Sequence, residues 1–355
     1  MSRARRAVLV SIAAALAATA APAYATNTSE TSGPGYAYLR SDLLGESPTG
    51  MKVLVDKRAG QKHASAIASF AKADVRTMAA LHLPITFGGY YTKATTASGS
   101  ITITESRKGC GAVKGGDRAG LTEAEFTTIP AGASEPAGTA PSWYVDHSVI
   151  YLCPDLLTVA TPKLSPVQRR LPAKSRAVVL AKLKKKAKAE ATKLQKTTVA
   201  HELGHAVGLG HTSYKVRGKY QVMYPVANSA PTTYASGDLA GLAALAAGSD
   251  AVKRAFPPEG TVGHSGPTGS TLTVTGSAKL KYLPGTSVHV ELRVAQVGGS
   301  AFSTPTETTA DGTFAFNTAL LSPACYTVTA TSPFGPSTVL GGFSFFDGSG
   351  RPPAC

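Results

Sequence analysis

The 355-residue chain is short of acidic residues, cysteines and long apolar runs. Its 21 acidic residues stand against 36 basic ones, which gives a formal net charge of +15 at pH 7. Charged residues make up only 16% of the chain and apolar residues 43%, so a disordered polyelectrolyte is excluded. No C-x2-C spacing occurs, which excludes a zinc ribbon. The length fits two ordinary domains.

The one extended apolar run covers residues 7–21 and is too short to cross a membrane. Arg3, Arg5 and Arg6 precede it, and Ala23-Tyr24-Ala25 has the A-x-A form of a cleavage site. We therefore predict a signal peptide at residues 1–25 and a secreted, extracellular mature chain without a transmembrane segment. The adjacent arginines leave the export route open between general and twin-arginine secretion.

The four cysteines suit an oxidising compartment. Cys110 and Cys153 lie in the first half of the chain, and Cys325 and Cys355 lie near its end. Four cysteines allow three pairings, and pairing within each group closes each loop inside one predicted domain. We predict the disulfides Cys110–Cys153 and Cys325–Cys355, against the alternative of four free thiols.

Residues 26–256 alternate between strand and helix patterns. Strands are predicted at 51–56, 85–91, 100–104 and 148–152, and helices from 61 to before Pro84, at about 174–209 and at about 236–256. This order predicts an α+β domain with one twisted sheet.

The last part of the chain has a different pattern. Residues 257–269 carry three prolines and four glycines, which predicts a linker. Beyond it the period is two, because Val288, Val290, Leu292 and Val294 alternate with polar residues. Short alternating strands separated by turns predict an immunoglobulin-like β-sandwich at 270–355. No residue in it has the pattern of a catalytic group.

The stretch HELGHAVGLGH spans residues 201–211. On a helix His201 and His205 share one face because they are four residues apart. Gly208 can end the helix and turn the chain, which would bring His211 to the same ion. Three neutral imidazoles with one open position are typical of a catalytic zinc site.

Glu202 lies beside the first histidine and is a candidate general base for a water activated by the metal. The alternative is a structural helix that happens to be rich in histidine. Three histidines and one glutamate at fixed spacing are rare by chance, so we favour the metal site. His63, His82, His147, His264 and His289 show no ligand spacing and are interpreted as ordinary surface or structural residues.

The stretch resembles the metzincin signature, H-E-x-x-H-x-x-G-x-x-H followed by a methionine turn. Met223 lies twelve residues after His211, within QVMYP. Thr212 and the Met-Tyr-Pro turn resemble the matrixin branch, over about residues 49–256. The resemblance implies a zincin fold, one catalytic Zn²⁺, Glu202 as general base and acid, and Met223 as a floor beneath the ligands. It implies a secreted metalloendopeptidase whose protein or peptide substrate binds beside a sheet edge.

The chain also departs from the matrixin pattern. It has no cysteine switch ahead of the domain, so no latency mechanism is predicted. Pro225 stands where astacins and serralysins carry a tyrosine that can contact zinc, so Tyr224 receives no catalytic role. The pocket-wall stretch reads Pro-Val-Ala, which leaves cleavage preference unassigned. Asp117 and Asp146 are isolated acids, so a structural Ca²⁺ is unsupported.

Residues 162–196 have no counterpart in the matrixin pattern and are interpreted as an insertion. Twelve basic residues and one acidic residue, Glu190, give them a formal charge of +11. Apolar residues recur at helical spacing among the lysines. The segment is either a solvated helix face or a dock for an anionic surface polymer. No aromatic residue interleaves with the lysines, so nucleic acid is not expected.

We expect the protein to act as a monomeric zinc metalloendopeptidase. The alternative is a secreted binding or adhesion protein that works through the C-terminal sandwich, with the zincin domain as a scaffold.

Overall fold

The structure is a computed structural model of the chain. It describes residues 9–16, 36–40, 43–58, 61–93, 95–110, 112–113, 116–129, 142–159, 161–225, 230–266, 268–296 and 298–345. The chain divides into two compact units, one from Met1–Thr128 and Ser142–Asp250, the other from Ile129–Pro141 and Ala251–Cys355. Within the described ranges, no helix combines the length and apolar character needed to span a bilayer.

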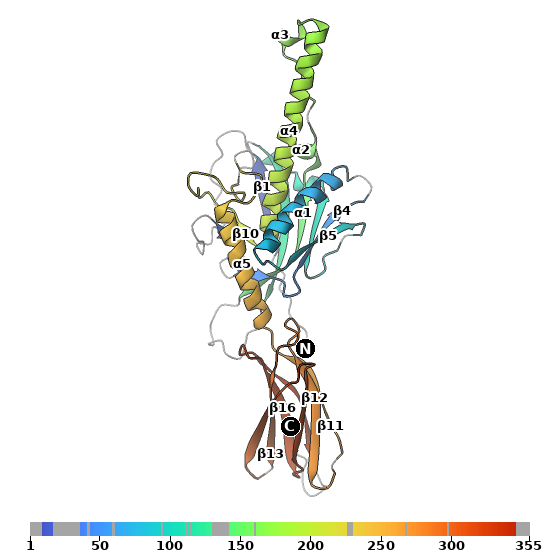
Figure 1. Cartoon of the computed structure of the whole chain (residues 1–355), viewed down its shortest axis with the longest axis vertical. Helices are drawn as coiled ribbons and strands as arrows, with labels where there is room; N and C mark the ends of the chain where they lie inside the picture. The colour runs from blue at the N-terminus through green and yellow to red at the C-terminus, as the bar shows by residue number, and fades with distance from the viewer. Residues whose placement is uncertain are drawn as a thin grey trace. The chain divides into compact units, whose positions relative to one another are not determined.

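The first unit is built on a mixed sheet in the order β1-β8-β9-β6-β4-β5 (Figure 1). Four neighbouring strands run parallel: β5 (Ile85–Tyr91), β4 (Met51–Asp56), β6 (Ser100–Glu105) and β9 (Trp143–Leu152). β8 (Gly116–Thr128) lies antiparallel to β9. The strands predicted at 51–56, 85–91, 100–104 and 148–152 are confirmed, although β9 begins five residues before its predicted start.

Shorter strands complete this sheet. β3 (Leu43–Glu46) pairs with β9, and β7 (Ala112–Val113) pairs with β8. β1 (Leu9–Leu16) pairs antiparallel with the remaining side of β8. β1 lies within the predicted signal peptide, whose basic head and cleavage site are outside the described residues. A two-stranded sheet joins β2 (Ala37–Tyr38) to β10 (Leu209–Gly210).

The long helices pack on the sheet as their sequence patterns predict. α1 (Ala64–Ala80) buries Ile67, Ala71, Val75 and Met78, which are three or four residues apart. α4 (Ala173–Ala206) contacts α1, β8 and β9. α5 (Ser236–Arg254) adds Leu242 and Leu245 to the same core. α2 (Pro154–Leu157), α3 (Pro166–Arg169) and the 3₁₀ turn η1 (Arg107–Gly109) are short.

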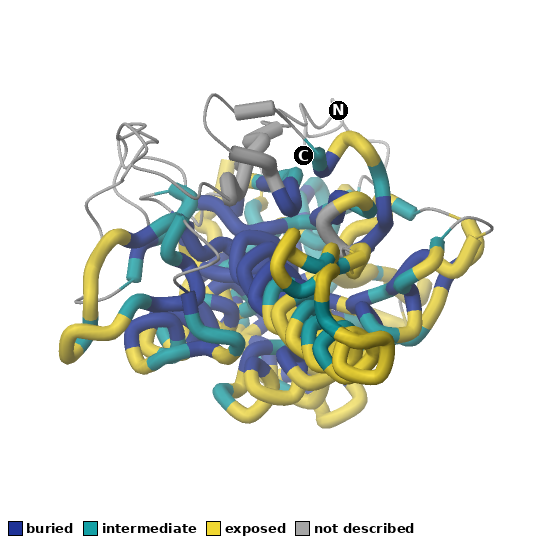
Figure 2. The backbone as a smooth tube through the Cα atoms, turned by 90° about the horizontal axis from the view of Figure 1, so that it is seen from above, coloured by how far each residue is buried: buried dark blue, intermediate teal, exposed yellow. Residues whose placement is uncertain are grey.

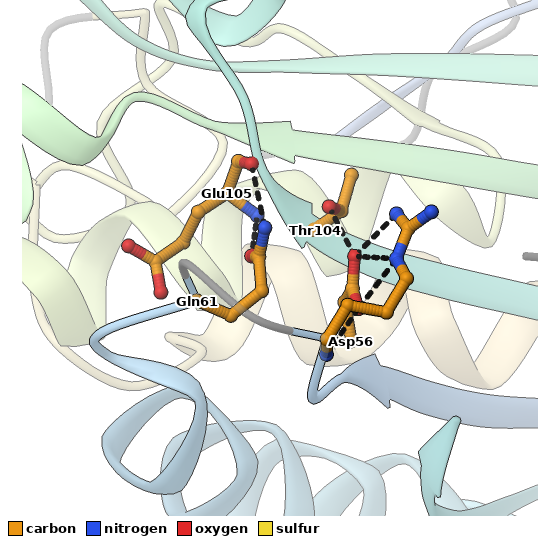
Figure 3. Close-up of polar contacts among 5 residues, drawn as sticks. Asp56, Gln61, Thr104 and Glu105 are labelled. Atoms are coloured by element: carbon orange, nitrogen blue, oxygen red, sulfur yellow. Dashed lines mark hydrogen bonds and ion pairs between the residues drawn. The ribbon is translucent and has the colours of Figure 1, made fainter. Parts of the chain in front are cut away.

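A polar cluster fixes the connection between β4 and α1 (Figure 3). Arg58 pairs with the buried carboxylate of Asp56, which also accepts a hydrogen bond from Thr104. Gln61 exchanges two hydrogen bonds with the backbone of Glu105. The Glu105 carboxylate accepts the backbone N–H of His63, 2.6 Å away, at the start of α1. These contacts satisfy polar groups at the carboxyl ends of two parallel strands.

The predicted disulfide Cys110–Cys153 is confirmed. It joins the residue after η1 to the residue after β9, and the two cysteines are 43 residues apart. Cys325 is disulfide-bonded as well. Its predicted partner, Cys355, lies outside the described residues.

The second unit contains two antiparallel sheets. One joins β11 (Glu259–His264), β12 (Thr271–Lys279) and β15 (Thr313–Ala319). The other has the order β14 (Ala301–Glu307), β13 (His289–Gln296), β16 (Ala324–Thr331) and β17 (Ser337–Phe345). Inward-facing residues of both sheets form one hydrophobic core, and the alternation predicted for Val290, Leu292 and Val294 is confirmed.

The predicted linker at 257–269 is wrong over its middle, because Glu259–His264 form β11 along β12. One of its glycines, Gly260, is required by close strand pairing. A Cβ on Gly260 would collide with the carbonyl oxygen of Ser277. Gly260 therefore marks a crowded position on an edge strand.

Candidate metal centre

Three histidine side chains converge at the end of α4. His201 and His205 lie on its last two turns, and His211 follows β10. Each pair of their Nε2 atoms is 3.1 Å apart. Three nitrogens at the corners of such a triangle can all lie about 2.0–2.1 Å from one ion, the length of a Zn–N bond. The predicted ligands are therefore brought together as one possible metal site.

The hydrogen bonds of two histidines define which nitrogen faces the centre. Nδ1 of His201 donates to the carbonyl oxygen of Val222 at 2.8 Å. Nδ1 of His205 donates to the carbonyl oxygen of Leu209 at 2.7 Å. In a neutral imidazole the other nitrogen then carries a lone pair and no proton. These lone pairs repel one another at 3.1 Å unless a cation lies between them.

Burial keeps these imidazoles neutral. Desolvation lowers the pKa of His201 to about 4 and that of His211 to about 3. Desolvation also holds the pKa of His205 well below its usual value, and repulsion from His211 and His201 adds to the effect. Neutral imidazole is the form that binds a metal ion, so the site is in its binding form at neutral pH.

Two glycines allow the ligand segment to fold. Gly208 follows the helix with φ +107°, a conformation that residues with a Cβ rarely adopt. A Cβ there would collide with the side chain of Leu43. A Cβ on Gly204 would collide with the sulfur of Met223, which is 1% exposed. Met223 therefore packs directly against the turn that carries His201 and His205.

Glu202 is fully buried on the same turn. The Thr122 hydroxyl on β8 donates to Oε2 of Glu202 at 2.6 Å and lies 3.1 Å from the carbonyl oxygen of the same residue. Gly120, two residues earlier on β8, leaves room for the carboxylate, because a Cβ there would lie 2.7 Å from Oε1. β8 thus orients the candidate base. Sequence reasoning missed both residues because it missed β8.

Asp238, at the start of α5, is a further residue that holds the candidate site in place. The carboxylate of Asp238 accepts the backbone N–H groups of Val222 at 2.8 Å and of Met223 at 3.2 Å. It also accepts the N–H of Ala235 at 2.9 Å. Because the Val222 carbonyl accepts from His201, Asp238 indirectly positions a candidate metal ligand. Its place in the first turn of a predicted helix was the one signal that could have drawn attention to it.

The other candidate residues do not join this centre. A second group of possible ligands in the described chain is Cys110, Cys153 and Asp155, but the two sulfurs form a disulfide. His63 pairs with Glu105, His147 with Glu125, and His289 with Glu307. Asp146 accepts the Ser98 hydroxyl at 2.6 Å. The side chain of Asp117 is outside the described residues.

No family model matches the chain, and no curated protein matches it either.

Proposed function

We propose that the chain is a secreted zinc-dependent metalloendopeptidase. The observation that carries the proposal is the triangle of Nε2 atoms, 3.1 Å on each side, beside the buried Glu202. His201, His205 and His211 would hold the ion and leave one position open. When bound, zinc supplies Lewis-acid chemistry, activating a water molecule as nucleophile and polarising the scissile carbonyl.

The chain's own residues supply the proton transfers. The Glu202 carboxylate accepts the proton of the attacking water and then donates it to the leaving amine nitrogen. The Thr122 hydroxyl, 2.6 Å from Oε2, holds the carboxylate in one orientation. Asp238 and Met223 keep the ligand turn in place without touching the substrate.

The sheet also offers a place for an extended peptide. β8 carries Gly120 and Thr122, the residues that contact Glu202. Its side away from β9 is paired, among the described residues, by β1, whereas β7 pairs with the other side of β8. β1 belongs to the predicted signal peptide, so its removal would free that edge next to Glu202. A peptide added antiparallel to β8 would bond through its backbone, so these contacts would not depend on its side chains.

The test compares the mature chain with Glu202→Gln on an unfolded protein and a short fluorogenic peptide. Gln cannot take up the proton, so kcat/KM should fall by about 10²–10⁴-fold, while zinc content stays at one ion per chain. Glu46→Gln is the matched control, because Glu46 is equally buried but bonds to Ser249 through its backbone N–H. It should cleave at the parent rate.

Chelation of the metal should abolish cleavage by the parent, and added Zn²⁺ should restore it. A parent chain that holds zinc but cleaves nothing would overturn the proposal and favour the binding-protein alternative. Cleavage by Glu202→Gln at the parent rate would overturn the assigned role of Glu202.

A further inference from the structure

The first two-thirds of α4 extend beyond the packed body of the first unit. Continuous burial begins at Thr197, and from Ala173 to Leu194 no residue of the helix is buried (Figures 1 and 2). α2 and α3 each contact α4, and Arg176 in this part donates a hydrogen bond to the carbonyl of Arg169. Most of its surface therefore faces solvent.

The lysines of this segment form a stripe. At 100° per residue, seven of them fall within an arc of about 160°, which we call the lysine stripe: Lys174, Lys182, Lys185, Lys186, Lys188, Lys193 and Lys196. At 1.5 Å per residue the stripe is about 33 Å long. Half-buried apolar residues lie on the opposite side, at Leu183, Ala187 and Leu194.

The stripe contains no acidic residue. Glu190, the single acid of the segment, lies outside the arc; among the described residues it pairs with Lys186, at 3.8 Å with both side chains exposed. Unbalanced positive charge on one face raises the local concentration of anions. A surface on which both signs of charge are mixed attracts anions less. The segment's net charge is thus concentrated in one direction.

The inner end of the stripe borders a hollow of about 450 Å³. Lys185, Lys188, Lys193 and Lys196 line it, and Thr232, ahead of α5, forms part of its wall. Four cations around one hollow repel each other unless anions lie among them. Four of the seven stripe lysines thus border one hollow at the inner end of the stripe.

We propose that the lysine stripe and its hollow dock a linear phosphate polymer, a chain of phosphate or phosphodiester groups. Lysine ammonium groups bind phosphate as point charges, and the stripe presents about one such group per helical turn. The docking is independent of the proposed peptidase activity and would hold the protein at a polyanionic surface.

Two other anionic partners fit the stripe less well. A bilayer surface favours a helix with large apolar residues opposite its charges and free to insert, but here α2 and α3 contact the helix and Val178 is the single large apolar side chain on the stripe. Recognition of nucleic-acid bases uses aromatic stacking, and the helix from Ala173 to Leu194 has no aromatic residue.

The experiment measures binding of the full chain to labelled inorganic polyphosphate across a salt series. The stripe variant changes Lys182, Lys185, Lys188 and Lys193 to Gln, which keeps helix propensity. It should bind at least 30-fold more weakly, and the slope of log K against log salt should fall by about 3 in magnitude, at about 0.7 per phosphate contact. Circular dichroism checks that both proteins stay folded.

The matched control removes the same charge elsewhere, by changing Lys52, Lys72, Lys93 and Lys279, all exposed, to Gln. Its affinity should stay within about threefold of the parent. Equal loss in both variants would overturn the proposal in favour of a general charge effect, as would absence of binding at low salt. Tighter binding to anionic vesicles, or to single-stranded DNA of the same phosphate number, would reassign the surface to those partners.

Discussion

The two ends of α4 belong to one unbroken helix but are stabilised in different ways. From Ala173 to Leu194 the chain is rich in Ala, Lys and Leu, which favour a helix intrinsically. From Gln195 to Ala206 it contains Thr197, Thr198, Val199 and Gly204, which favour a helix poorly, and eleven of these twelve residues are buried.

The difference separates intrinsic propensity from tertiary packing. The exposed end forms a helix because of its own composition, and positive charge recurs along its axis. The segment from Gln195 to Ala206, which carries His201 and His205 and which we call the metal end, is helical for another reason. β8, β9, α1 and the Met223 turn pack around it. Contacts from residues distant in the chain should therefore govern the metal end alone.

The largest effect is expected from Asp238→Ala. Three backbone N–H groups lose their acceptor, and each buried unpaired donor costs about 1–3 kcal/mol. We expect the free energy of unfolding to fall by about 3–5 kcal/mol in denaturant titrations. Hydrogen exchange should accelerate at residues 195–206 and stay unchanged at residues 175–190. Equal acceleration at both ends would contradict the separation between them.

Asp74 lies on α1 near Lys196, where the two ends of α4 meet. Burial raises the pKa of Asp74 from 3.8 to about 7, despite the opposing influence of Lys196. The folded chain therefore binds more protons than the unfolded chain between pH 4 and 7, so stability falls as the pH rises through that window. At about 1.4 kcal/mol per pKa unit, the fall is at most about 4 kcal/mol.

Asp74→Asn should remove this pH dependence, measured as the free energy of unfolding at pH 4.5 and pH 7.5. An unchanged difference between the two pH values would show that another group is responsible.

Gly204→Ala tests packing against propensity at the metal end. Alanine favours a helix by about 1 kcal/mol, but its Cβ would displace the buried sulfur of Met223. Overpacking costs about 1–3 kcal/mol, so we expect net destabilisation of up to about 2 kcal/mol and weaker zinc binding. Thermal unfolding with and without zinc measures both. A more stable variant would mean that helix propensity outweighs packing at the metal end as well.

The smallest effect is expected at the exposed end. Ala189→Gly should cost about 1 kcal/mol of helix stability, seen as lost helical signal without a change in zinc affinity. Ala200→Gly, at a residue that is 0% exposed, should cost more, because it also removes a buried methyl group. If the two substitutions lower the free energy of unfolding equally, burial does not contribute to the stability of the metal end.

The sequence predicts the parts of the site that are local. The spacing of His201, His205 and His211 and the turn at Gly208 depend on helix geometry, and the structure confirms that they come together. Thr122 could not be predicted, because it lies 80 residues from Glu202 and its approach depends on strand pairing.

The fold could be predicted where burial leaves a periodic pattern. β4, α1 and α5 show that pattern, and so does the alternation of β13. β8 does not, because its side facing α4 carries Gly120, Thr122 and Ala124, whose small size admits the helix but gives no hydrophobic signal. The glycines of β11 likewise give no hydrophobic signal, which is why its sequence predicts a linker.

Zinc stoichiometry measures the central claim most directly. The chain, stripped with a chelator and dialysed against dilute Zn²⁺, should bind one tightly held ion, and Glu202→Gln should bind the same amount. His205→Ala should lose that ion, because it removes one corner of a nitrogen triangle with 3.1 Å sides. Zinc binding that is absent from the parent, or unchanged by His205→Ala, would contradict the account.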